Sequence, residues 1–245
     1  MKGNITHNVE IFEQTETLFK MAADLILDSS EIAIRLRGRF VIVLSGGNTP
    51  EQLYTLLAAY PFSDKIDWEK TFVFWGDERC VPLEDKRNNA HRAEILLLDK
   101  VSIPKENIHR IPVDLPPAEA AKTYEETIRT FFGKEEWSFD IILLGLGENG
   151  HTASLFPNTP IINSTEKGVK EVYVEEEKMY RVTMTAPLIN LGRQILFLVT
   201  GECKADILEK IFGNIYNPKT YPAQLIIPQS GELTWFIDRE AAHKI

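Results

Sequence analysis

The sequence predicts an α/β fold, a doubly wound and mostly parallel sheet with helices on both of its faces. Short, uninterrupted apolar runs such as residues 40–44 are typical of strands that are buried on both faces. Longer segments with apolar residues three and four positions apart, such as residues 13–37, are typical of amphipathic helices. Because the two kinds of segment alternate along the chain, parallel strands joined by helices are favoured.

In the N-terminal part, a helix is expected over residues 13–37 and a strand over 40–44. The Gly-rich turn after this strand leads to Thr49 as a helix N-cap, with Pro50 at the first helical position and Gln52 completing a capping box. This second helix is expected to end near residue 60.

The same order of elements continues along the chain. An apolar strand is expected at 71–75, a charged loop at 76–87 and a helix at 88–98. Residues 119–132 have the spacing of an amphipathic helix, and 139–144 form another apolar run.

Towards the C-terminus, the polar segment 161–178 has no clear period and is expected to be an exposed excursion. Its triplet Glu175-Glu176-Glu177 is interpreted as a solvated face. Residues 181–185 alternate like a strand. The last expected elements are a buried strand at 195–200, a helix at 203–212 and short strands at 224–227 and 234–237.

Composition limits the class of protein. The 245 residues, 44% apolar and 26% charged, suit one domain over 1–245. The net charge of −9 repels phosphate backbones, so we expect no nucleic-acid partner. The polar residues 1–14 lack the apolar core of a secretion signal, and no stretch is apolar for long enough to span a membrane. We therefore expect a cytoplasmic protein without a membrane partner, with Cys80 and Cys203 as reduced thiols.

Four polar, Gly-containing segments follow predicted strands, and ligands of open parallel sheets bind outside the carboxyl ends of the strands. We therefore expect one site at this edge of the sheet. The segments are 45–50, 76–79, 145–151 and 201–204.

The first two of these segments favour anion binding and acid–base chemistry. In SGGNTP, backbone N–H groups and a helix N-terminus would hold a phosphate, helped by the hydroxyls of Ser45 and Thr49. An ordinary tight turn is the alternative. In GDER, Asp77 is a candidate base and Arg79 a candidate for stabilising an oxyanion, although a salt-bridged loop without a catalytic role is equally compatible.

The third segment, GLGENG followed by His151, matches the dinucleotide fingerprint GxGxxG. Its place past mid-chain and the nearby Pro157 argue against a dinucleotide, because the fingerprint opens a long helix. His151 lies in a polar loop and is a candidate catalytic base. Ser154 lacks a G-x-S-x-G elbow, so a serine hydrolase is not indicated. No metal site is predicted, because none of the other histidines stands at a metal-ligand spacing from His151; they are His7, His91, His109 and His243.

Two cations complete the candidate site. Arg181 opens a predicted strand and Lys204 begins a predicted helix, and both stand at strand ends of the same sheet. Each alone is typical of a surface cation, but together they would complete a phosphate pocket.

The ordered motifs resemble those of the 6-phosphogluconolactonase family, which is related to the glucosamine-6-phosphate deaminases. From about residue 40 to 242 the chain contains SGGNTP, FWGDERCVP, Asn88-Asn89, LGLGENGHTASLFP, RVTMT, FLVTGECKA, YPAQLI and LTWFIDREAA. The resemblance implies a Rossmann-like fold and hydrolysis of 6-phospho-D-glucono-1,5-lactone in the pentose phosphate pathway. It also implies a small phosphosugar lactone as the only partner, no cofactor, and a monomer or small homo-oligomer.

Site roles are carried over from the family position by position. His151 would activate water, while Asp77 and Arg79 would line the sugar end. The substrate and its phosphate would be bound by Ser45, Gly46, Gly47, Asn48, Thr49, Asn89, Glu148, Asn149, Gly150, Arg181 and Lys204.

The sequence after His151 favours the lactonase branch, because HTASLFP lacks the carboxylate of the deaminase sequence that resembles GHIAFNEP. One departure concerns Asn149, where the family usually has Asp, so that either Glu148 substitutes or the Asp is dispensable. A milder one is Asn88, where Ser is more usual. A deaminase, a non-catalytic sugar-phosphate-binding protein and, more remotely, a dinucleotide-dependent oxidoreductase remain as alternatives.

Overall fold

Residues 8–245 are described by a computed structural model. Residues 1–7, and with them His7 and half of the polar N-terminal stretch, lie outside the described residues. The main sheet has six strands in the order β1-β9-β8-β5-β2-β3, and all neighbouring pairs are parallel. The strands are β1 (Asn8–Phe12), β2 (Phe40–Leu44), β3 (Thr71–Trp75), β5 (Ile141–Leu144), β8 (Gln194–Val199) and β9 (Glu232–Asp238).

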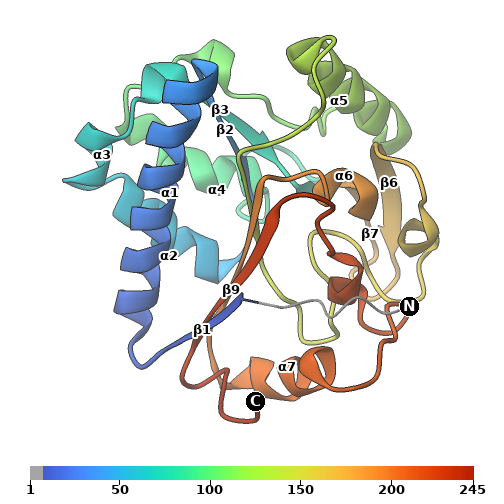
Figure 1. Ribbon diagram of the computed structural model, residues 1–245. Helices are drawn as coiled ribbons and strands as arrows, with labels where there is room; N and C mark the ends of the chain where they lie inside the picture. Colours follow the sequence, from blue (N-terminus) through green and yellow to red (C-terminus); the bar gives the residue numbers. More distant parts are fainter. Residues whose placement is uncertain (1–7) are drawn as a thin grey trace.

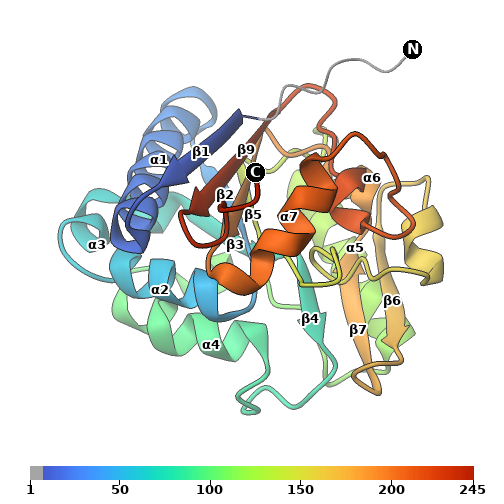
Figure 2. The same ribbon diagram turned by 90° about the horizontal axis from the view of Figure 1, so that it is seen from below.

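Helices lie on both sides of this sheet, which confirms the predicted fold class (Figures 1 and 2). One side carries α1 (Thr15–Arg37), α2 (Asn48–Leu57), α3 (Phe62–Lys65) and α4 (Asn89–Leu96). The other side carries α5 (Pro117–Phe132), α6 (Ala186–Ile189) and α7 (Ala205–Phe212). Strands β2 and β5 are buried at every residue because helices cover both of their faces, as their continuous apolar sequences indicate.

A second, antiparallel sheet was not expected from the sequence. Its order is β4-β7-β6, with β4 (Asp77–Arg79), β6 (Val169–Val174) and β7 (Met179–Met184). The prediction of an irregular loop at 76–87 and of an exposed excursion at 161–178 is therefore wrong in part. In β6, three valines are buried and the residues between them are exposed, but two consecutive polar residues interrupt the alternation that would have indicated a strand.

Gly76 joins the two sheets. Its N–H donates to the carbonyl of Leu44 in β2 at 3.0 Å, and its carbonyl accepts from the N–H of Met184 in β7 at 2.8 Å. The peptide units on either side of Gly76 therefore belong to different sheets, and β4 leaves the parallel sheet directly after β3.

Smaller differences concern the ends of elements. Helix α2 begins at Asn48 with Gly47 as its N-cap, so the predicted cap at Thr49 is wrong. The expected strand at 224–227 is replaced by a 3₁₀ helix, Pro222–Leu225, and strand β1 was not predicted. Across residues 8–245, no helix is both long enough and apolar enough to cross a membrane.

Candidate active site

The candidate site lies where the strand order of the main sheet reverses. The chain passes from β2 to β3 on one side and later returns to β5 on the other side of β2. The loops that follow β2 and β5 therefore diverge, which opens the crevice in which α/β proteins bind ligands. A cavity of about 480 Å³ lies there, a volume suited to a small metabolite. Twelve predicted site residues line it: Ser45, Gly46, Gly47, Asn48, Thr49, Asp77, Arg79, Asn89, Glu148, His151, Arg181 and Lys204.

The loop after β2 is held in place at both ends. The hydroxyl of Tyr54 accepts from the N–H of Ser45 at 3.0 Å and donates to its carbonyl at 2.6 Å. Gly47 has φ +110°, a conformation that favours glycine. The hydroxyl of Thr49 contacts that of Thr200, at the end of β8, at 2.8 Å. Thr49 thus ties the loop after β2 to the loop after β8 instead of capping the helix.

The loop after β5 folds tightly around His151. The N–H of Gly147 donates to the carbonyl of His151 at 2.8 Å, and the N–H of Gly150 donates to the carbonyl of Gly147 at 2.9 Å. A Cβ on Gly147 would lie 2.1 Å from Nδ1 of His151, and Gly150 has φ +83°. These two glycines of GLGENG therefore allow the imidazole to pack against the backbone. Their presence is explained by this packing, and no bound dinucleotide is needed to explain it.

The contact of His151 with Asn149 determines which ring nitrogen is basic. Oδ1 of Asn149 lies 2.6 Å from Nδ1 of His151 and accepts from its backbone N–H at 3.1 Å. The backbone N–H of His151 is a donor, so the side-chain atom that it meets is the amide oxygen, which only accepts. Nδ1 therefore carries the ring proton, and Nε2 is the unprotonated nitrogen of a ring that lines the cavity. Asn149 and Gly150 themselves do not line the cavity.

The surroundings of His151 favour its neutral form. The ring is stacked on Phe156, with centroids 4.0 Å apart. Burial, followed by the positive charge of Arg181, lowers the pKa of His151 to about 4. His151 is therefore neutral near pH 7 and is free to accept a proton.

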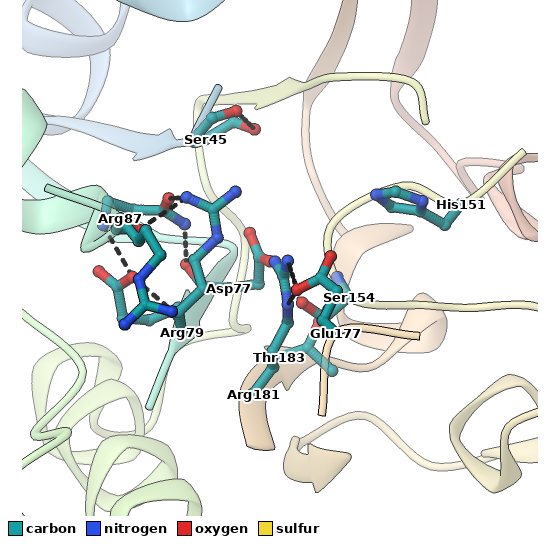
Figure 3. A network of polar contacts seen from close by, with 12 residues as sticks. Ser45, Asp77, Arg79, Arg87, His151, Ser154, Glu177, Arg181 and Thr183 are labelled. Atoms are coloured by element: carbon teal, nitrogen blue, oxygen red, sulfur yellow. Dashed lines mark hydrogen bonds and ion pairs between the residues drawn. The ribbon is translucent and has the colours of Figure 1, made fainter. Parts of the chain in front are cut away.

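Asp77 and Arg181 face each other inside the cavity (Figure 3). The buried carboxylate of Asp77 accepts from the hydroxyl of Ser154 at 2.5 Å and lies 3.6 Å from Nη1 of Arg181. Arg181 also pairs with Glu177, and its guanidinium lies 5.4 Å from the ring centroid of Phe156. Asp77 is thus oriented by a hydroxyl and neutralised by a cation that itself has a second carboxylate partner.

Arg79 approaches the same space from the opposite side of Asp77 (Figure 3). Its Nη1 donates to Oδ1 of Asn89 at 2.8 Å and to the carbonyl of Arg87 at 2.7 Å. Glu78 lies between Asp77 and Arg79 in β4, and it is fully buried and does not line the cavity. Burial raises the pKa of Glu78 to about 7, against the effect of backbone N–H groups that donate to its carboxylate.

Lys204 closes the far side of the cavity. It lies after β8, and its Nζ is 3.9 Å from Oε1 of Glu148, whose side chain is 70% exposed. Because the Glu148 carboxylate is exposed and the pair is long, it contributes little stability, so Lys204 is free to turn towards an anion. Within residues 8–245, no three His, Cys, Asp or Glu side chains come together as metal ligands.

Three residues of the network were missed by sequence reasoning: Glu78, Ser154 and Glu177. Glu78 had a usable signal. Side chains alternate along an extended segment, so with residues 77 and 79 both placed in the site, Glu78 would point to the opposite side, away from the site. Glu177 had none, since its contact depends on the turn between β6 and β7, which was not predicted.

Comparison with known proteins places similar sequences along almost the entire chain. Residues 13–235 match the family described as "Glucosamine-6-phosphate isomerases/6-phosphogluconolactonase". A 6-phosphogluconolactonase from Synechocystis sp. is 40% identical over 241 residues, 97% of this chain and 98% of the relative. One from Haemophilus influenzae is 37% identical, covering 90% of this chain and 94% of the relative. The crystal structure of a protein called devB is 36% identical with a TM-score of 0.88, covering 98% of this chain and all of the other.

Proposed function

The chain belongs to the 6-phosphogluconolactonase family, and from this membership we propose that it hydrolyses 6-phospho-D-glucono-1,5-lactone to 6-phosphogluconate in the pentose phosphate pathway. The observation that carries the proposal is the contact between Nδ1 of His151 and Oδ1 of Asn149. It leaves Nε2 as a free base in a cavity that also contains a Gly-rich anion loop.

The phosphate of the lactone would bind at the turn after β2. Backbone N–H groups of residues 46–49 and the N-terminus of α2 favour an anion there, and Lys204 and Arg181 line the same cavity. Because Glu177 is already paired with Arg181, an incoming phosphate competes with this carboxylate. Binding the phosphate at one end orients the lactone carbonyl at the other.

Hydrolysis then needs one base and one oxyanion partner. Nε2 of His151 takes a proton from a water molecule as its oxygen forms a bond to C1 of the lactone. The guanidinium of Arg79 stabilises the tetrahedral oxyanion. When the oxyanion collapses and the bond between C1 and the ring oxygen breaks, the imidazolium of His151 returns the proton to that oxygen. The ring is then neutral again, and the product is the carboxylic acid, which gives 6-phosphogluconate by losing its proton to solvent.

All of these groups come from one chain, so a monomer or a small homo-oligomer would serve equally. No cofactor enters the proposed steps, and we propose a cytoplasmic location.

The direct test is hydrolysis of freshly generated lactone, followed against its spontaneous rate. The variant His151→Asn is expected to lower kcat by about 10²- to 10⁴-fold, the contribution typical of a general base. His243→Asn, at an exposed histidine near the C-terminus, is the matched control and should keep wild-type kcat. Turnover of His151→Asn within a few-fold of wild type would refute the assignment.

Two further measurements separate the alternatives. Ammonia released from glucosamine 6-phosphate would indicate a deaminase, whereas lactone binding without turnover would indicate a sugar-phosphate-binding protein. Arg181→Ala is expected to raise KM for the lactone through weaker phosphate binding; an unchanged KM would remove Arg181 from that role.

A further inference from the structure

Glu78 is a buried carboxylate directly behind the cavity. It is 1% exposed and lies in β4 between Asp77 and Arg79, both of which line the cavity. Its two oxygens accept from three backbone N–H groups at 2.8 Å: Oε1 from Arg79 and Asn89, and Oε2 from Ala90. All three of these donors to the oxygens of Glu78 are backbone N–H groups, and none is a cationic side chain.

Two of these donors belong to the first turn of α4. The first N–H groups of a helix have no partner within it, and the positive end of the helix dipole favours a carboxylate. Glu78 satisfies Asn89 and Ala90, while the side chain of the N-cap residue Asn88 accepts from the N–H of His91 at 2.9 Å. Two side chains therefore cap α4, and of these two Glu78 is the one that lies in β4.

The residue that Glu78 attaches is itself part of the cavity wall. Oδ1 of Asn89 accepts from Nη1 of Arg79 at 2.8 Å, and Nδ2 donates to the carbonyl of Asp77 at 3.0 Å. The same amide packs on the loop after β2, because a Cβ on Gly46 would lie 1.8 Å from Oδ1. A shift of Asn89 would therefore move the guanidinium of Arg79 and the anion loop together.

We infer that Glu78 is a positioning residue of this site: it fixes Asn89 at the start of α4, and through Asn89 it sets the guanidinium of Arg79 where the oxyanion forms. The inference rests on the proposed lactonase function for its last step only. The positioning of Arg79 by Glu78 is a property of the free protein and is testable without substrate.

The first experiment is a double-mutant cycle on kcat. Glu78→Gln keeps the volume but turns an amide N–H₂ towards one of the three backbone donors, so kcat is expected to fall by about 10- to 100-fold, the range of a misplaced catalytic group. In the Arg79→Lys background the same change should have less than a twofold effect, because Arg79 is then no longer there to be positioned. Equal losses in both backgrounds would overturn the inference.

The matched control is Asn88→Ala, which removes the other cap of α4 without touching Arg79. It should lower Tm and leave kcat within twofold of wild type. A kcat loss as large as that of Glu78→Gln would mean that any weakening of the helix start disturbs the site, and Glu78 would then have no special role.

If Glu78→Gln does not fold, the variant Asn89→Ala tests the same positioning of Arg79. It leaves Glu78 in place and removes the amide that holds Arg79, so it should reproduce the loss of kcat. Wild-type kcat in Asn89→Ala would overturn the proposed connection.

A substrate-free measurement separates this inference from the proposed function. The side-chain N–H signal of Arg79 in an NMR spectrum of the free protein should shift and broaden in Glu78→Gln but not in Asn88→Ala. If the wild-type protein does not hydrolyse the lactone, the proposed function fails and this signal still decides the positioning. An unchanged Arg79 signal in Glu78→Gln would refute the positioning even in an active enzyme.

Discussion

Replacing Asn149 by Asp tests the electrostatics of the candidate base. Oδ1 of Asn149 lies 2.6 Å from Nδ1 of His151, so Asn149→Asp places a negative charge about 4 Å from the centre of the imidazolium charge. Opposite charges favour the charged form, so the pKa of His151 must rise. At an effective dielectric constant of about 20 the attraction is about 4 kcal/mol, or about three pKa units. The partial burial of the new carboxylate opposes part of this effect.

We therefore expect the pKa of His151 to rise from about 4 by about one to three units in Asn149→Asp. A base whose pKa is closer to the working pH accepts a proton more readily, so kcat at pH 7.5 is expected to rise about tenfold. The pKa is measured by NMR titration of the ring nitrogens, with His151→Asn identifying the signal.

Asn158→Asp is the matched control. It makes the same chemical change at an exposed asparagine that does not contact His151. It should leave the titration of His151 unchanged. The reasoning fails if wild-type His151 titrates near its ordinary value, or if Asn149→Asp shifts its pKa by less than about half a unit.

The remaining predictions concern the anion site and the core. Glu177→Gln removes the carboxylate that competes for Arg181 and should lower KM for the lactone about threefold or more; an unchanged or higher KM contradicts this competition. Gly46→Ala should lower Tm, because its Cβ would lie 1.8 Å from Asn89, whereas Gly145→Ala, with open space around its Cβ, should not. Tyr124→Phe removes the hydroxyl that contacts both backbone groups of Trp75 and should cost about 1–3 kcal/mol of unfolding free energy, against almost nothing for exposed Tyr173→Phe; equal effects would contradict it.

The central strands of the parallel sheet were predictable because they are short apolar runs. Strand β1 was missed because it mixes polar with apolar residues and is partly exposed. Strand β5 is buried at all four residues, and burial on both faces leaves no alternation to misinterpret. The small sheet was not predictable for the opposite reason. Strand β4 has only three residues, all of them charged, and its pairing with β7 depends on residues far along the chain.

The site was predictable at the level of loops. Polar segments after parallel strands meet at one edge of the sheet by geometry alone, which explains why the loops after β2, β5 and β8 line one cavity. Arg181 was expected at a strand end of the same sheet, and this is wrong: it lies within β7 of the small antiparallel sheet. The partners of the site residues were harder to find. The hydrogen bond from Ser154 to Asp77 joins the loop after β5 to β4, two segments that only the assembled fold brings together. The catalytic and binding roles stay predictions, because positions alone do not show them.

Gly76 also bears on when in folding the protein becomes competent. Asp77 reaches its place only after β4 has paired with β7, and that pairing closes a long stretch of chain. Closing a long loop costs entropy that local contacts do not, so such pairings form late. The pair of β2 and β3, whose partners lie much closer together in the sequence, can therefore form before the cavity has its acidic wall. During synthesis, before β7 has left the ribosome, the loop after β2 would be formed while the site still lacks Asp77 in its final position. In a refolding experiment, the recovery of activity would then report the pairing of β4 with β7, the step that completes the active site.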